Sequence, residues 1–307
     1  MAKRVLAVMG AIAIVLVAIA VRAAWTDDDD GGDGPGGGVL TVACDPDLAA
    51  ACRTLEDVTV EVLDSDEVSR AFVEEELDVD AWVTSSAWAE LTTARVAEPE
   101  ALGAVERLAT AEVVVATIET RAPILVDHCG STPIWRCLGD AAGQPWDALG
   151  GLSSWGNVRT GLPDADTATG LAVLASLAVG YFDGPEFAAN DFAGFDTWLA
   201  RLTEASGTGD RDLLVTLVRR RGTYDAGGVL RHEAVERPEV EVLDVEPAVP
   251  VDAVLVSVGG GTSDDLADDL RAALVDSGWR AAAGDPSPLL GRGVMGALHG
   301  LWKDVTR

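Results

Sequence analysis

The chain has little positive charge for its length. Among its 307 residues there are 22 lysines and arginines against 51 aspartates and glutamates, which gives a formal net charge of −29. The first 24 residues contain Lys3, Arg4 and Arg22 and no acid, so the rest of the chain has a formal charge of −32. Such a body repels polyanions at long range, and the sequence has no basic stripe to offset this. We therefore exclude nucleic acid as a partner.

The sequence also lacks the short motifs of several enzyme and cofactor-binding classes. It has no Gly-x-Ser-x-Gly segment and no Gly-Lys-Ser/Thr loop. Its three histidines, His128, His232 and His299, form no i, i+4 pair of the kind that holds zinc. His128 and His232 have acidic neighbours in sequence, but a catalytic triad is assembled by geometry. We predict no enzymatic activity, no cofactor and no metal site, with an exported hydrolase as a minor alternative.

A hydrophobic segment follows the first two bases. Residues 5–21 are uncharged and mostly aliphatic, and Arg22 ends the run. Its 17 residues lie at the short edge of the roughly 17–25 that span a bilayer, and exceed the roughly 7–15 of a signal-peptide core. Residues 18–20 also offer a small-x-small cleavage site. We predict that residues 1–25 are a signal anchor or a cleaved signal peptide. The body is then extracytoplasmic, either attached to the cell membrane by one N-terminal helix or secreted.

An acidic, glycine-rich stretch at 26–38 cannot bury anything and is predicted to be a solvated linker. The four cysteines beyond it fit an exported protein. Cys44 and Cys52 are eight residues apart, as are Cys129 and Cys137. An even number of cysteines outside the cytoplasm favours two disulfides. Of the three connectivities, we expect local pairing within each couple.

Alternating patterns begin after the linker. Residues 39–43, 58–63 and 80–84 have the composition of strands, and residues 48–55 and 68–77 have helical periodicity. The order strand, helix, strand, helix, strand predicts an α/β fold with a parallel sheet and helices on its faces.

The rest of the chain continues in a mixed order. Residues 112–118 and 122–126 are predicted to be strands, and 171–181 an apolar helix. Residues 240–246 and 253–258 are further strands. Two amphipathic helices at 263–277 and 294–305 complete the prediction.

Polar residues occupy two places where a strand leads into a helix. Ser85 and Ser86 follow the buried strand at 80–84, at the end where ligands bind in open α/β sheets. Thr167 and Thr169 stand at the start of the apolar helix, where free N–H groups suit an oxyanion. The simpler interpretation is that such residues only cap their helices. From the residues alone, we favour the cap for the second place.

Four segments in the same order carry a family resemblance: 40–46, Asp-Val-Asp-Ala-Trp-Val-Thr-Ser-Ser at 78–86, Leu-Pro-Asp-Ala-Asp-Thr-Ala-Thr-Gly-Leu at 162–171, and Gly-Thr-Tyr-Asp-Ala-Gly-Gly at 222–228. With them, the body from about residue 39 to 300 resembles the extracellular solute-binding proteins of ABC importers, which have the type 2 periplasmic-binding fold. It is similar in style to the molybdate and sulfate binders. Residues 111–126 and 240–258 resemble the two crossings between lobes.

The resemblance implies two lobes, each a mixed or parallel sheet flanked by helices, that close on a small-molecule or ion solute. Lobe 1 is expected at 39–112 plus 245–307, and lobe 2 at 113–244. A membrane permease is the implied partner. The positions that match the family's cleft are Asp45, Ser85, Ser86, Asp164, Thr167, Thr169, Gly170 and Tyr224.

One departure from the family pattern concerns the first loop. Oxyanion binders of this kind usually have Ser or Thr there, whereas this chain has Cys44-Asp45-Pro46. A carboxylate at this place repels an anion, and so does the acidic body. The charge of the solute therefore stays open, with cationic and neutral solutes included. The alternative function is a membrane-anchored interaction or signalling ectodomain of the same fold that binds no small solute.

Overall fold

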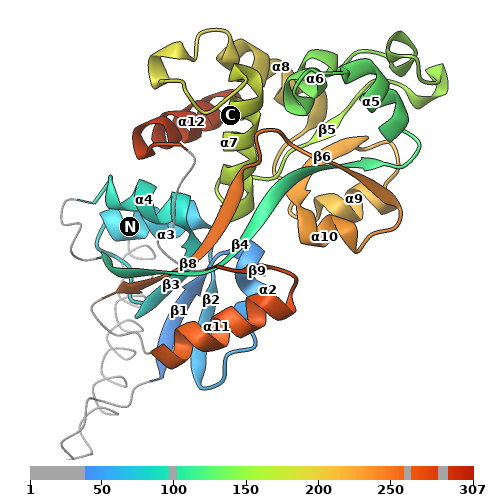
Figure 1. The fold of residues 1–307 in the computed structure, drawn as a ribbon. Helices are drawn as coiled ribbons and strands as arrows, with labels where there is room; N and C mark the ends of the chain where they lie inside the picture. The colour runs from blue at the N-terminus through green and yellow to red at the C-terminus, as the bar shows by residue number, and fades with distance from the viewer. Residues whose placement is uncertain (1–38, 97–101, 259–263, 283–289) are drawn as a thin grey trace, which may run out of the picture. The chain divides into compact units, whose positions relative to one another are not determined.

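The computed structural model describes residues 39–96, 102–258, 264–282 and 290–307 (Figure 1). In this part of the chain, strands join into one mixed sheet in the order β2-β1-β3-β8-β4-β6-β5, and β7 and β9 pair with β4 off that path. Residues 39–307 fold as one unit. The sheet has two halves, which we call the first and second half-sheets.

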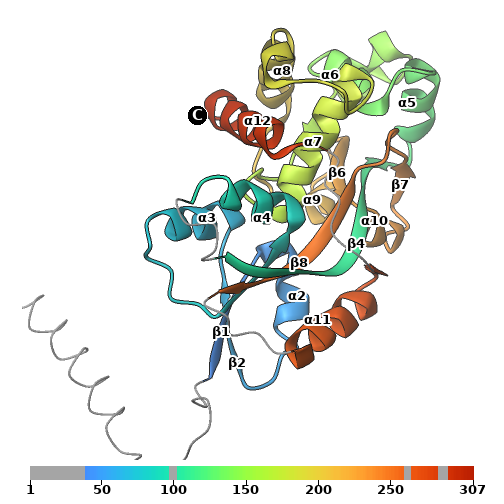
Figure 2. The same cartoon turned by 60° about the vertical axis from the view of Figure 1, so that its left-hand side comes forward.

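The first half-sheet contains β1 (Leu40–Cys44), β2 (Val58–Val62) and β3 (Ala81–Ser85), all parallel, with β8 (Pro250–Val258) antiparallel to β3. Helices cover both of its faces (Figures 1 and 2). One face is covered by α2 (Ala49–Cys52) and α11 (Asp264–Asp276). The short helix η1 (Pro46–Leu48) leads into α2. The other face is covered by α3 (Ser65–Val73) and α4 (Ser86–Thr93).

Strand β4 (Leu102–Ile118) runs through both half-sheets. Its residues 102–112 pair with β8, and its residues 113–118 pair with the strands of the second half-sheet. The second half-sheet contains β6 (Ala226–Leu230), β7 (Val240–Leu243) and β5 (Thr160–Gly161). Strand β9 (Arg280–Ala281) pairs with the first part of β4.

Side chains alternate across the second part of β4, as the pleat of a strand requires. Val113 and Val115 belong to the main core, which includes α7 (Ala168–Phe182). Val114 and Ala116 belong to a smaller core on the opposite face. That core contains residues of α9 (Leu213–Arg219) and α10 (Arg231–Val235).

Helix α7 is the central helix of the fold. Residues 168–180 are all buried, which explains why its sequence is apolar all round rather than on one stripe. Three helices pack around it: α6 (Ile134–Ala141), α8 (Phe195–Ser206) and α12 (Arg292–Val305). The other helices of this part of the chain are α5 (Ala122–Cys129) and the short helices η3 (Trp146–Leu149), η4 (Ser153–Trp155) and η5 (Ala189–Asp191).

One predicted strand is wrong. Residues 122–126 form the first turns of α5, and not a strand. Pro123 stands in the first turn of this helix, where the N–H that proline lacks would have no intrahelical partner.

Both cysteine couples pair locally, as predicted: Cys44 with Cys52 and Cys129 with Cys137. The division into lobes at 112/113 and 244/245 stays a prediction. The predicted N-terminal helix lies outside the described residues. Within those residues, no helix is long and apolar enough to cross a membrane.

Candidate functional site

Residues 164–170, which we call the α7 start, link the loop after β5 to the first turn of α7. Thr167 precedes the helix, and its Oγ1 accepts a hydrogen bond from the Gly170 N–H at 3.1 Å and donates one to the Asp164 carbonyl at 3.1 Å. The Thr167 carbonyl accepts another from Trp88 Nε1 on α4 at 3.0 Å. Thr167 thus caps the helix, as the simpler interpretation of the sequence held.

Gly170 is required by packing. A Cβ at this position would lie 1.6 Å from the carbonyl oxygen of Asp164, inside the loop that folds back on the helix. No side chain fits there unless the loop moves. Gly170 therefore allows the loop to approach the helix closely, which is a structural reason for a residue that the family resemblance placed in a cleft.

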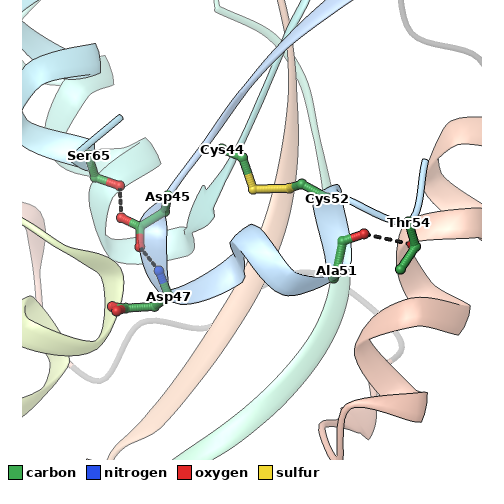
Figure 3. Close-up of a disulfide and its surroundings, with 7 residues drawn as sticks. All are labelled: Cys44, Asp45, Asp47, Ala51, Cys52, Thr54 and Ser65. Atoms are coloured by element: carbon green, nitrogen blue, oxygen red, sulfur yellow. Dashed lines mark hydrogen bonds between the residues drawn. A yellow bond between two sulfur atoms is a disulfide. The ribbon is translucent and has the colours of Figure 1, made fainter. Parts of the chain in front are cut away.

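Asp45 directly follows the last residue of β1, and its carboxylate contacts the α7 start. The residue is fully buried, and its Oδ2 accepts hydrogen bonds from the Ala168 N–H at 2.9 Å and from Ser65 Oγ at 2.5 Å. Its Oδ1 accepts the N–H of Asp47 at 3.0 Å. Ser65 Oγ also lies 2.7 Å from Thr84 Oγ1. Figure 3 shows Asp45 between Ser65 and Asp47, next to the Cys44–Cys52 disulfide.

Asp47 completes the contacts of what we call the Asp45 cluster (Asp45, Asp47, Ser65 and Thr84). Its Oδ2 accepts the Thr169 N–H at 2.8 Å. The first N–H groups of α7 are therefore all used inside the protein: Ala168 by Asp45, Thr169 by Asp47 and Gly170 by Thr167. These groups are the ones with which a helix start holds an anion. Here none of the three is free for an external ligand.

The electrostatics of the Asp45 cluster are unusual because two carboxylates meet. Burial raises the pKa of Asp45 well above its usual value, and the nearby charge of Asp47 raises it further. The hydrogen bonds from Ser65, Asp47 and Ala168 act in the opposite direction. The site therefore tolerates one buried carboxylate by hydrogen bonding and repels further negative charge.

A pocket of about 340 Å³ lies beside this cluster. Leu48 and Ala51 of the first half-sheet side form one wall, and Leu213 and Val229 of the second half-sheet side form another. Trp279 adds an aromatic surface. Two arginines, Arg211 and Arg237, line the pocket against six acids: Asp47, Asp164, Asp210, Asp212, Glu233 and Glu236. Acids dominate the lining.

Glu233 on α10 is the acid most affected by this environment. Its pKa is raised to about 7, first because its surroundings are poorly solvated and second because the charge of Asp47 is near. Glu233 is nonetheless exposed to solvent as part of the pocket lining. Arg211 is paired with Asp64 at 2.6 Å, which leaves its charge partly neutralised. The pocket is therefore suited to a positive group.

A second group of charged residues, the Lys303 cluster (Asp66, Arg95, Asp166, His299 and Lys303), holds the α7 start from α12. His299 Nε2 lies 2.9 Å from Asp166 Oδ1, and Lys303 Nζ contacts Asp166 and lies 3.5 Å from Asp66. Burial acts to raise the pKa of Asp166, but the hydrogen bonds from His299 and Lys303 outweigh it and hold the pKa below its usual value.

Three members of this cluster, Asp66, Asp166 and His299, have ligand atoms within 4.8 Å of one another, a spacing that suits a metal ion. The Lys303 ammonium already supplies positive charge to both carboxylates. Arg95 Nη2 lies 3.2 Å from His299 Nδ1, and because arginine only donates, Nδ1 is the acceptor and Nε2 carries the proton toward Asp166. This arrangement fits an ion-pair network better than a metal centre.

The structure gathers most of the sequence-predicted site residues around the α7 start. Asp45, Asp164, Thr167, Thr169 and Gly170 all lie there, and Asp164, Thr167 and Thr169 also line the pocket. Whether they bind a solute stays a prediction.

The remaining predicted residues are placed differently. Ser85 and Ser86 are buried at the junction of β3 and α4, and within the described residues the Ser85 hydroxyl has no hydrogen-bond partner. Tyr224 is buried in the smaller core and does not line the pocket. Burial, together with the charge of Asp210, raises its pKa.

Sequence reasoning missed the partners of these residues. Thr84 was within a predicted strand and Ser65 lay between two predicted elements, but nothing in their local pattern indicates that their hydroxyls meet. Asp47 lies two residues after Asp45, a spacing that favours a turn closed by the first carboxylate. Asp66 and His299 are 233 positions apart, so only the fold brings them together.

No protein-family model matches the chain, and no curated protein matches it. Solved structures do match. Iron-bound HitA from Pseudomonas aeruginosa is 15% identical with a TM-score of 0.54, covering 87% of this chain and 100% of its own. The periplasmic binding protein AfuA from Actinobacillus pleuropneumoniae, with fructose-6-phosphate bound, is 13% identical with a TM-score of 0.51, covering 83% and 89%.

An ABC transporter structure from Clostridium perfringens ATCC 13124 is 11% identical with a TM-score of 0.50, and covers 87% of this chain and 100% of its own. The structural neighbours are thus periplasmic solute-binding proteins of ABC transporters. At these identities the likeness establishes the fold. The chain has the mixed α/β fold of the type 2 periplasmic-binding proteins, as the resemblance implied.

Proposed function

We propose that this chain is an extracytoplasmic solute-binding protein that holds a small organic cation in the pocket beside the α7 start and delivers it to a membrane permease. The observation that carries the proposal is the pocket's lining. It combines six acids with the apolar and aromatic surfaces of Leu48, Leu213 and Trp279, and these residues come from the sides of both half-sheets. The fold supports a binding role, and the anchored or secreted location is part of the proposal, based on the sequence pattern of residues 1–25.

An oxyanion is disfavoured as the solute on two grounds. The N–H groups of the α7 start are already bonded to Asp45, Asp47 and Thr167. The neighbouring pocket presents carboxylates, which repel an anion. The pocket favours a cation with an apolar stem, because the carboxylates attract its charge and the apolar walls bury its stem.

A thermal-shift panel tests this proposal. Putrescine, lysine and arginine are compared with sulfate, molybdate, phosphate and MgCl₂ at constant ionic strength. A solute at 100 times its dissociation constant adds about 2.7 kcal/mol of stability, or several degrees in Tm for a body of this size. We expect a rise with at least one organic cation and none with the oxyanions. A rise with an oxyanion alone would contradict the proposal.

Variants locate the binding. Glu233→Gln and Glu236→Gln remove charge inside the pocket, and we expect each to reduce the shift. Glu241→Gln is the matched control, because Glu241 is exposed on β7 and does not line the pocket. A shift that survives both pocket variants would place the solute elsewhere.

The ligand-free ectodomain remains the second candidate function, and one observation favours it. The side chains of Asp45 and Asp47 themselves join the loop after β1 to the α7 start. If no compound in the panel changes Tm, this function replaces the first. A non-enzymatic role is part of both proposals: His232 packs against Trp279 with ring centroids 5.4 Å apart, and His128 is exposed on α5.

A further inference from the structure

Two helices begin at the carboxylate of Asp45. Ser65 is the first residue of α3 and donates its hydroxyl to Oδ2, and Ala168 is the first residue of α7 and donates its N–H to the same atom. Each helix start carries a partial positive charge. Asp45 and both partners are buried, so solvent contributes little to holding this carboxylate. The surrounding protein supplies the hydrogen bonds that water would otherwise give.

The donors around Asp45 are all uncharged. They are two backbone N–H groups and one hydroxyl, and within the described residues no salt bridge involves Asp45. Asp225, another deeply buried acid, is held differently: Arg121 Nε lies 3.2 Å from its Oδ1. Uncharged N–H and O–H donors at helix starts are the groups by which proteins hold oxyanions without a counter-charge. The surroundings of Asp45 thus have the chemistry of an oxyanion site.

We propose that Asp45 is a built-in ligand: its carboxylate fills an oxyanion site formed by Ala168, Ser65 and Asp47, and joins the loop after β1 to α7 without a solute. Asp45 then determines specificity, because it excludes free oxyanions from the helix start. The proposal does not depend on which solute, if any, occupies the neighbouring pocket. It also implies that a chain without this side chain gains a site for a small carboxylate.

The test is chemical rescue of Asp45→Gly, which removes the CH₂–COO⁻ group that acetate matches. Tm is measured against acetate and formate, with chloride at equal ionic strength as the reference. We expect the variant to be destabilised and its Tm to rise by several degrees as acetate or formate saturates the vacated site. The wild-type protein should show no such rise with acetate, formate, sulfate or phosphate.

Two further variants make the result specific. Asp45→Asn keeps the volume of the side chain and creates no space, so carboxylates should not restore it. Asp80→Ala removes a carboxylate that accepts the Thr41 N–H at 2.8 Å in the sheet, away from any helix start, and should not respond either. If Asp80→Ala responds as strongly as Asp45→Gly, the rescue is a general salt effect and the proposal fails.

The remaining outcomes also decide the question. A folded Asp45→Gly that ignores acetate and formate contradicts the proposal, as does a wild-type protein that gains as much stability as the variant. If Asp45→Gly does not fold, Asp45→Ser takes its place in the same titration, because its shorter side chain leaves space and its hydroxyl offers an acceptor to Ala168. Absence of rescue in that folded variant has the same meaning.

Discussion

The α7 start is held from two sides, and the two sides use carboxylates in different ways. In the Asp45 cluster the carboxylates meet only backbone N–H and hydroxyl donors, and Asp45 is fully buried. In the Lys303 cluster, Asp66 and Asp166 meet charged partners from α12, and the side chain of Lys303 stays 31% exposed. Salt screens exposed charges far more than buried ones. The first side should therefore contribute more to stability, and the second should depend more on salt.

The largest effect is expected from Gly170→Ala, which disturbs both sides at once. The added Cβ would meet the backbone of the loop that carries Asp166 and leads to Ala168, so the loop must move away from both clusters. We expect a loss of about 4 kcal/mol in urea unfolding, although alanine is the better helix former. Gly300→Ala in α12 is the control, because nothing lies near its Cβ, and it should stabilise by about 0.5–1 kcal/mol.

Asp45→Ala should come next, since it breaks only the buried side. It leaves the N–H groups of Ala168 and Asp47 and the Ser65 hydroxyl without their acceptor. Each unsatisfied buried donor costs roughly 1–3 kcal/mol, so we expect a loss of about 3 kcal/mol in denaturant unfolding that 1 M NaCl barely changes. A loss below that of Lys303→Ala would reverse the order of the two sides.

Lys303→Ala sharpens the comparison from the exposed side. We expect a loss of about 1 kcal/mol at low salt and pH 7 that shrinks at 1 M NaCl.

Asp166→Asn tests the pH dependence of the Lys303 cluster. The pKa of Asp166 is lowered in the folded protein, so its contribution to stability is present above the unfolded pKa of 3.8 and is lost as pH falls through the pKa of the folded protein. Unfolding of the variant should therefore depend less on pH below 4 than unfolding of the wild-type protein.

The smallest effect on stability is expected from Glu233→Gln in the pocket, where the pH profile is the informative measurement. With a pKa of about 7, Glu233 ionises as pH rises from 6 to 8, so calorimetry should show putrescine binding more tightly at pH 8. The variant should lack that dependence. Folding stability in the absence of putrescine should change in the opposite direction. In the unfolded chain Glu233 ionises near pH 4.5, but in the folded protein only near pH 7. The raised pKa therefore lowers folding stability as pH rises from about 4.5 to about 7. Equal pH profiles for the two proteins would remove Glu233 from the binding site.

Much of this organisation could be predicted from local sequence patterns. The strand at 80–84 and the apolar helix from 171 have compositions that do not depend on distant residues, and close spacing favoured Cys44–Cys52 and Cys129–Cys137. Residues 122–126 show where local patterns fail, because a short apolar run with β-branched residues suits either a strand or a buried helix.

The candidate site could be predicted only in part. Asp45 and Thr167 stood at the ends of predicted elements, which made both visible as site residues. The sequence indicated that a carboxylate at position 45 would repel an anion, but not that this carboxylate would take the anion's place at Ala168. That contact joins positions 123 apart, and no local periodicity encodes it.

The sequence by itself determined the acidic body of charge −32, the helices and strands with strong periodicity, the local cysteine pairs and the cap at Thr167. These depend on composition or on neighbours along the chain. The tertiary structure alone decided that two helices begin at Asp45, that Lys303 neutralises Asp166, and that acids from separate elements line one pocket. The physical reason is that burial and charge pairing depend on which distant segments the sheet brings together.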